Sequence, residues 1–509
     1  MTRQHTIHRR TFMGGLVSLP MMMAGCSTPP SEVNPDRRAV ELRKRIDGLI
    51  KETEPVTGPI SLYEAMARAI KYNLDQKIEQ MDEALRLKQL NVKRLDMLPQ
   101  LVANLGYNTR SNDTGSVSRS LLTGRQSLEA SSSSDRSNIT SDITASWDVL
   151  DFGLAYVRAR QQANEQLIAS ERRRKVINRI VEDVRIAYWR AVSADRTFKR
   201  LVQVESMAQK AIAQAEELES RRVVAPVTVL SYQRDLLQVQ SEVQKLQREL
   251  TLAKSQLAAL MSMPPDKSYT LVLPDRTDVP PELPGSARDM IMVALRFRPE
   301  IRESAYRAEI LKLEKDASFL RQLPSVKAIL GLNHDSNQFL YNQDWLSFSS
   351  RVSWNVMSVF KGPAEREALD AELQAVEQRD LALTLAIMTQ THVARVRFVR
   401  LSQELNTNRK SQSVQNRITA LSRSGFQART ISQQNLVREE MNDVLAEVRY
   451  DVAYADLQNA FANLYSSMGL DNFDLKMDGD TSIQSIARQL EEHWQDRAGS
   501  LPPMPDGIS

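Results

Sequence analysis

Apolar side chains recur at alternating steps of three and four residues over two long stretches of the chain. The cleaner stretch contains Leu236, Val239, Val243, Leu246, Leu250, Ala253, Leu257 and Leu260. This spacing is typical of helices that pack lengthwise on one another. It predicts long helices over residues 153–220 and 362–424, and helices of about half that length over 61–98, 228–261, 286–323 and 430–468. Two shorter helices placed end to end would match one long helix of about 100 Å.

Prolines indicate where several of these helices begin and end. Pro99 and Pro324 should stop the helices over 61–98 and 286–323, because the residue before a proline avoids the α conformation. Pro363 follows Gly362 and is expected at the first helical position of the helix over 362–424.

Four short stretches alternate between apolar and polar residues, which predicts strands near 100–109, 139–149, 325–334 and 345–356. Each has about the ten residues that cross a bilayer as a tilted strand, with apolar side chains toward lipid. Trp147, Tyr107, Trp345 and Trp354 would suit an interfacial girdle. A half-buried sheet of a water-soluble domain is the alternative interpretation. The expected lipid-facing positions are Leu101, Leu105, Trp147, Leu346, Phe348, Val352 and Trp354.

The chain contains an internal duplication with an offset of 225 residues. Ser61 aligns with Ser286, and Pro99 aligns with Pro324. We expect repeats over 61–263 and 286–470, joined by a proline-rich linker over 264–285 and followed by a C-terminal flank and tail over 471–509. Four strands cannot close a membrane barrel, which needs at least eight. Two copies would supply eight strands, whose interior side chains would fill, whereas three would supply twelve and leave room for a channel. Physics therefore favours a trimer, with four copies as the alternative that stays open.

The N-terminus has the features of a secretory signal over residues 1–25. Arg3, Arg9 and Arg10 precede an apolar, Met-rich stretch that is too short to span a bilayer as a helix. Cys26 is the only cysteine and directly follows Ala24-Gly25, as in a bacterial lipobox. We therefore expect acylation of Cys26 and a lipidated N-terminal segment over 26–60, with a transmembrane anchor or an incidental cysteine as the alternative. A single acyl chain anchors weakly, so a triacylated cysteine or a second attachment is expected.

Composition excludes several classes of function. The formal charge of +4 falls to +1 once the three arginines of the signal are removed, which is unlike a nucleic-acid-binding protein. The five histidines show no metal-ligand spacing, and no glycine-rich turn precedes Lys-Ser or Lys-Thr as a phosphate loop would. We expect no enzymatic activity, no metal and no cofactor apart from the covalent lipid.

The chain resembles the outer membrane efflux protein family, the TolC-like outer membrane factors, over residues 61–470. The resemblance rests on the order, spacing and duplication of several short motifs. It implies a mainly α fold with a small β part: a duplicated long-helix hairpin unit forms an α-helical periplasmic barrel, and four strands per chain contribute to a 12-stranded transmembrane β-barrel of a homotrimer. The motifs are Ser61-Leu62-Tyr63-Glu64-Ala65, Leu98-Pro99, Trp147-Asp148-Val149-Leu150-Asp151-Phe152-Gly153, Ala187-Tyr188 and Leu464-Tyr465-Ser466-Ser467-Met468-Gly469.

The family further implies a passive exit channel in the bacterial outer membrane, docked on a periplasmic adaptor and an inner-membrane pump. A protein-secretion channel and a pore-free coiled-coil scaffold lipoprotein remain alternatives. The resemblance places the periplasmic mouth at the turns over 221–228 and 423–431, with Gly425 as the turn glycine. Gln433 and Gln434 lie where family members often carry acids, and a solvated helix surface is the plainer interpretation. The residues expected at the mouth and adaptor contact are Arg222, Ala225, Arg423, Gly425, Gln433 and Gln434.

Overall fold

A computed structural model describes residues 34–127, 129–221, 225–264, 267–276, 281–471, 481–497 and 500–503. The chain divides into two compact units, Met1–Thr53 and Glu54–Ser509. The first unit contains helix α1 (Pro35–Glu52), in which Arg37 and Arg38 both pair with Glu41. The expected signal over 1–25 and Cys26 lie outside the described residues, and the predicted domain boundaries stay predictions.

Four long helices of the second unit confirm the prediction from the apolar spacing. They are α4 (Val149–Ser220), α5 (Pro226–Leu260), α8 (Met357–Gln427) and α9 (Gln433–Ser467). With 72 residues, α4 is about 108 Å long. The expected start at Gly362 was wrong, because α8 begins at Met357 and Pro363 lies inside it. A proline this close to a helix start removes one hydrogen bond of the first turns and leaves the rest of the helix intact.

The two helices expected over 61–98 and 286–323 are each broken in two. Asn73 separates α2 (Leu62–Tyr72) from α3 (Leu74–Leu95), and Arg298 separates α6 (Ala287–Phe297) from α7 (Pro299–Leu320). The two break residues are 225 positions apart and have nearly identical backbone angles, with φ −64° and ψ 129° at Asn73 and φ −64° and ψ 128° at Arg298. Asn73 accepts a hydrogen bond from the Asp75 amide at 2.8 Å, while Arg298 precedes Pro299.

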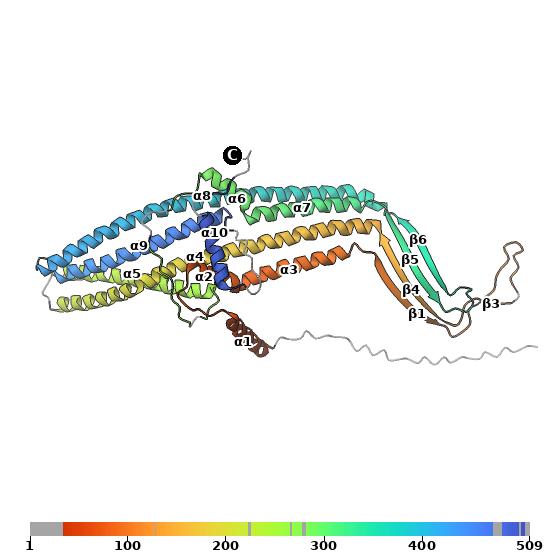
Figure 1. Cartoon of the computed structure of the whole chain (residues 1–509), viewed down its shortest axis with the longest axis horizontal. Coiled ribbons are helices and arrows are strands. Elements are labelled where there is room, and N and C mark those ends of the chain that lie inside the picture. The colour runs from red at the N-terminus through yellow and green to blue at the C-terminus, as the bar shows by residue number, and fades with distance from the viewer. Residues whose placement is uncertain are drawn as a thin grey trace, which may run out of the picture. The chain divides into compact units, whose positions relative to one another are not determined.

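The helices form a layer whose order changes halfway along the long helices. In the half next to the sheet, α3 packs on α4, α4 on α7 and α7 on α8. In the other half, α5 packs on α4, α4 on α9 and α9 on α8 (Figure 1). The long helices α4 and α8 therefore run through both halves, and shorter helices follow one another along them, as the matched lengths predicted.

The largest buried clusters lie where the broken helices meet the long ones. Ile70 of α2, Val184 and Tyr188 of α4 and Leu257 of α5 share one cluster, which also takes in α10 (Ile483–Arg497) through Ile486. The second repeat has its own cluster, formed by α6, α8 and the last turns of α9. The buried apolar groups thus fasten the middle of each repeat, between the sheet and the far helix turns.

Gly469, just past the end of α9, closes the second of these clusters. Its φ is 71°, and an added Cβ would lie 2.8 Å from the Arg298 amide nitrogen and 2.8 Å from the Phe297 carbonyl carbon. Ser262 has φ 55° at the corresponding place after α5. Because backbone atoms cannot move aside as a side chain does, Gly469 is required for both the left-handed conformation and the close approach.

Gly469→Ala should therefore lower the free energy of unfolding by about 2–4 kcal/mol, combining left-handed strain with overpacking. Urea or thermal unfolding followed by circular dichroism measures the change. Gly58→Ala is the matched control, because an added Cβ there meets no atom within 4 Å. Equal stability of the two variants would contradict the proposed close approach.

The strands form one antiparallel sheet in the order β1-β4-β5-β6. They are β1 (Gln100–Thr109), β4 (Ser137–Asp148), β5 (Ser325–Asp335) and β6 (Asp344–Ser353); β2 (Gly115–Ser116) and β3 (Ser131–Ser132) pair separately in the loop between β1 and β4. The four predicted strands are confirmed, but two of them end early. Asp148 caps α4, so Val149 is helical, and β6 stops at Ser353, before Trp354 and Val356.

Candidate functional site

One face of the four-stranded sheet is apolar and exposed. The strand register places Leu101, Ala145, Leu330 and Phe348 opposite one another, and Ala103, Ile143, Leu332 and Leu346 form the next row. Leu101 and Phe348 are each 72% exposed. Six of the seven positions predicted to face lipid lie on strands of this face and are exposed. The seventh, Trp354, follows just beyond β6, and its Nε1 donates a hydrogen bond to the Gln322 carbonyl oxygen at 2.9 Å. The six are Leu101, Leu105, Trp147, Leu346, Phe348 and Val352.

The opposite face is mostly polar and hydrogen-bonded from strand to strand. Asn104 Nδ2 donates to Asp142 Oδ2 at 3.0 Å, and Asn333 Nδ2 donates to Ser347 Oγ at 2.8 Å. Trp345 also lies on this face, because the register places it opposite Asn333. The expectation that Trp345 joins a lipid-side girdle was therefore wrong. A sheet with one exposed apolar face and one polar face suits a wall between lipid and water.

Aromatic side chains gather where the sheet meets the helices. Trp147 and Phe152 pack edge to face with ring centroids 5.7 Å apart, and both are exposed. Trp354, Phe360 and Phe319 are exposed at the same boundary. Aromatic rings that stay exposed at one level are typical of a membrane–water interface.

Among the described residues, no further element of the chain covers either lateral edge of the layer. Strands β1 and β6 have one neighbour each, and helices α3 and α8 occupy the corresponding edges of the helical layer. The edge helix α3 exposes apolar side chains at heptad-like spacing, and α8 exposes a second set. The residues are Leu74, Ile78, Met81, Leu85, Val92 and Leu95 on α3, and Leu381, Leu385, Val414, Ile418 and Leu421 on α8. Open strand edges and long apolar stripes favour association with further chains.

Among the predicted mouth residues, those that the structure describes lie at the two turns farthest from the sheet. Ala225 precedes α5 and is exposed, whereas Arg222 lies outside the described residues. Gln433 and Gln434 are exposed in the first turn of α9. Gly425 lies in the last turn of α8, and the left-handed residue of this turn is Arg429, with φ 58°. Gly425 thus permits a close approach, since an added Cβ would lie 2.6 Å from Ile431 Cδ1.

A row of acids on α9 leads away from this turn, and sequence reasoning missed it. Arg423 Nε contacts Glu440 Oε1 at 3.0 Å, and Arg276 Nε contacts the buried Asp451 Oδ1 at 2.8 Å. Arg196 of α4 also reaches Asp451, at 3.4 Å. Burial raises the pKa of Asp451 even though both arginines oppose this effect. Steps of three and four residues along α9 were the signal that could have revealed Glu440, Asp443, Glu447 and Asp451.

The pH dependence of stability should reveal the half-buried Asp456 of this helix. Burial raises the pKa of Asp456 above its ordinary value, with Arg190 and Arg397 opposing. The folded protein therefore binds this proton more tightly than the unfolded chain, and ionisation costs stability as the pH rises from about 4. Asp456→Asn should melt at a higher temperature than the unsubstituted protein at pH 7 and at the same temperature in acid.

Glu54→Gln is the control of opposite sign. Burial alone would raise the pKa of Glu54, but hydrogen bonds from Lys71 and the Ile483 amide lower it overall. Its stabilising effect is therefore present above the ordinary pKa of the group and is lost as the pH falls. Thermal melts from about pH 2 to pH 8 cover the titration of both groups. Parallel curves for the two variants would contradict the assignments.

Two further observations concern the described residues alone. No group of three or more His, Cys, Asp or Glu side chains among them is placed to hold a metal ion. No helix among them is both long enough and apolar enough to cross a membrane.

Part of the chain matches a known protein family. Residues 68–262 match the family model described as Outer membrane efflux protein, which confirms the predicted resemblance over that range. Proteins of this family are transport conduits and not enzymes. No curated protein sequence is significantly similar to the chain.

Solved structures extend the similarity of the fold to both repeats. The outer-membrane channel OprN has a TM-score of 0.62 at 16% identity, covering 80% of this chain and 89% of its own. The open MtrE outer membrane channel of Neisseria gonorrhoeae has a TM-score of 0.58 at 16% identity, covering 80% and 88%. The outer membrane protein VceC of Vibrio cholerae has a TM-score of 0.60 at 11% identity, covering 80% and 96%. The fold is therefore that of outer-membrane channels, mainly helical with a small sheet.

Proposed function

We propose that this chain, which carries an outer membrane efflux protein domain over residues 68–262, is a passive exit channel in the bacterial outer membrane. It would act as a homotrimer within a tripartite export system for small toxic compounds. The observation that carries this proposal is the sheet. Its exposed apolar face ends in two edge strands, each with one open edge, and the sheet continues into long helices, of which α4 is about 108 Å long.

The strand count supports three copies. One chain supplies four strands, and a membrane barrel needs at least eight. Twelve strands from three chains close every edge and leave a lumen lined by the polar face. The apolar stripes on α3 and α8 would be covered by the same assembly, because these helices occupy the same two edges as β1 and β6.

A periplasmic adaptor and an inner-membrane pump are the proposed partners. The far helix turns, with Ala225, Arg423, Gly425, Gln433 and Gln434, would form the periplasmic mouth and contact the adaptor. A groove of about 370 Å³ between α5 and α9 lies close to these turns and offers a surface for helices of the adaptor. Acylation of Cys26 would add a lipid anchor; incorporation of labelled palmitate should disappear in Cys26→Ala.

Conductance in a planar bilayer tests the proposal. Protein purified from outer membranes should migrate as a heat-sensitive, high-mass band on gels and should produce discrete conductance steps. A stable protein that is monomeric in mild detergent and never conducts would overturn the proposal and favour a pore-free scaffold lipoprotein. A protein-secretion channel would also conduct, and dependence of toxic-compound resistance on the chain distinguishes it from the efflux channel.

A further inference from the structure

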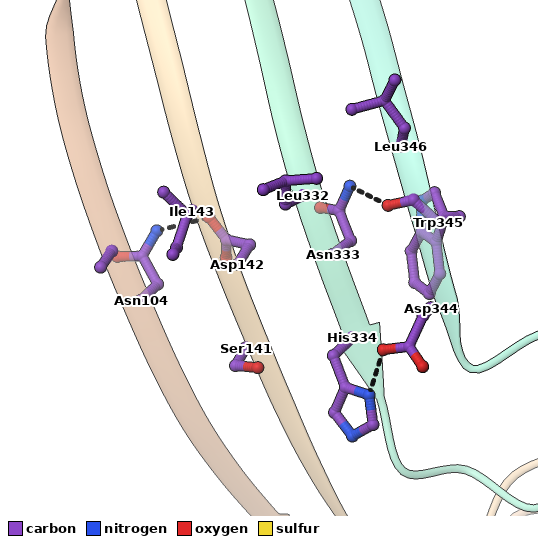
Figure 2. Close-up of a pocket in the computed structure, with 11 residues that line it drawn as sticks. Asn104, Ser141, Asp142, Ile143, Leu332, Asn333, His334, Asp344, Trp345 and Leu346 are labelled. Atoms are coloured by element: carbon purple, nitrogen blue, oxygen red, sulfur yellow. Dashed lines mark hydrogen bonds and ion pairs between the residues drawn. The ribbon is translucent and has the colours of Figure 1, made fainter.

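A single row across the polar face brings together one side chain from each of the four strands. The register places Asn104 opposite Asp142, Asp142 opposite Asn333, and Asn333 opposite Trp345. Figure 2 shows the four residues on four neighbouring strands of the sheet. Residues that share a row of a sheet face lie side by side, so the carboxylate, two amides and an indole form one continuous surface.

Hydrogen bonds within the sheet hold the polar members of this row in place. Asp142 Oδ2 accepts from Asn104 Nδ2 at 3.0 Å and from Thr144 Oγ1 at 2.8 Å. Asn333 Nδ2 donates to Ser347 Oγ at 2.8 Å and to the Trp345 carbonyl oxygen at 3.5 Å. These bonds fix the side chains without neutralising the charge of Asp142, since every donor is uncharged. Trp345 is 44% exposed, so part of its indole ring is open to a ligand.

A second carboxylate lies on the same face in the next row toward the outer loops. Asp335 is opposite Thr140, and its Oδ1 accepts from Asn138 Nδ2 at 3.1 Å. The basic residues of the four strands on this face are Lys327 and Arg351, which lie opposite each other. They are six residues nearer the helices than Asn333, or about 20 Å along the strand. Within the four strands, the outer half of the polar face therefore carries carboxylates and an indole and no basic side chain.

We propose that this row is a binding site for organic cations, above all planar aromatic ones, on their way out of the channel. The inference rests on the proposed function, because only a closed assembly turns the polar face into a lumen. An indole face attracts a cation through its quadrupole, and a fixed carboxylate adds direct charge attraction. Three copies would place three Asp142 carboxylates and three Trp345 rings at one level of the barrel.

Single-channel block tests the site with a matched pair of probes. Methyl viologen is an aromatic dication with two linked rings, and biphenyl-4,4′-disulfonate is an aromatic dianion with a similar two-ring frame. Methyl viologen should block the trimeric channel in a planar bilayer at lower concentration than the dianion. Asp142→Asn and Trp345→Leu should each weaken block by the cation about fivefold or more while leaving block by the dianion unchanged.

Asp344→Asn is the matched control. Asp344 is a carboxylate at the same end of the sheet, but it lies on the apolar face, where it pairs with His334 Nδ1 at 2.7 Å. Methyl viologen should block this variant at the same concentration as it blocks the unsubstituted channel. Asp142→Asn keeps the size of the side chain, and Trp345→Leu provides an independent arm if one variant assembles poorly.

The possible results separate the two proposals. Conductance without preferential block by methyl viologen, or an equal loss of block in Asp344→Asn, overturns the cation site and leaves the channel intact. Complete absence of conductance in the unsubstituted trimer overturns the channel and the cation site together. Selective loss of cation block in both row variants supports the site.

Discussion

Phe348→Arg should largely abolish the heat-sensitive trimer in outer membranes. Phe348 lies near the middle of β6 on the exposed apolar face, and a cationic side chain at the bilayer midplane costs about 2–4 kcal/mol. Three copies would carry this cost in one assembly, so the total is about 6–12 kcal/mol per trimer. Unheated gels of outer-membrane fractions, quantified against the denatured band, measure the loss.

Ser349→Arg is the matched control for this substitution. Ser349 is the next residue of β6, so its side chain lies on the polar face, where a charged group can stay hydrated. This variant should assemble at nearly the unsubstituted level. Equal loss of trimer in both variants would show that neither face of the sheet tolerates an arginine. That result would contradict the assignment of the Phe348 face to lipid.

Asp471→Asn should lower the free energy of unfolding by about 3–5 kcal/mol, because it leaves a buried arginine without its counter-charge. Arg185 Nη1 lies 2.8 Å from Asp471 Oδ2, and Arg185 Nη2 lies 3.2 Å from Oδ1. Both side chains are at most 5% exposed, and the guanidinium carbon lies 4.8 Å from the centre of the Trp494 ring. The pair thus joins α4 to the segment that follows α9, and it holds Arg185 against Trp494 of α10, so its loss should also loosen α10.

Urea unfolding and limited trypsin digestion together measure this effect. The variant should unfold at lower urea and lose α10 to trypsin faster than the unsubstituted protein. Arg234→Ala is the control, because Arg234 and Asp235 form an exposed pair worth at most about 1 kcal/mol. A stability change as small as that of the control would show that the Arg185–Asp471 pair is dispensable.

The apolar spacing predicted the long helices well, but it could not reveal the two breaks. Apolar residues continue across Asn73 and across Arg298, so at each of these places the pattern predicts a single uninterrupted helix. The local signals were present: an asparagine that can cap a helix, and an arginine that precedes a proline. Backbone chemistry at a single residue overrode a periodicity that extends over 38 positions of sequence, about ten turns of helix.

The alternating pattern predicted the four strands equally well, but it did not predict where they end. Alternation continues through Trp354 and Val356, although the chain leaves the sheet at Ser353 and α8 begins at Met357. Alternation along β6 already places Trp345 on the face opposite Leu346, and the register with β5 adds that its neighbour there is Asn333. The acids of α9 were overlooked because the resemblance directed attention to Gln433 and Gln434, one turn or more before them. Cross-strand and cross-helix pairing is a tertiary property that a single pattern does not encode.

The helix breaks lie at one level of the helical layer, and the helices between that level and the far turns are long. Below the breaks at Asn73 and Arg298, α5 and α9 each have 35 residues, or about 53 Å of helix. A tilt of one degree about the level of the breaks would displace the far turns by about 0.9 Å. Small rotations of the helices about the level of the breaks, where buried apolar groups hold them together, would therefore suffice to widen or narrow the opening at the far turns. No helix would have to unwind.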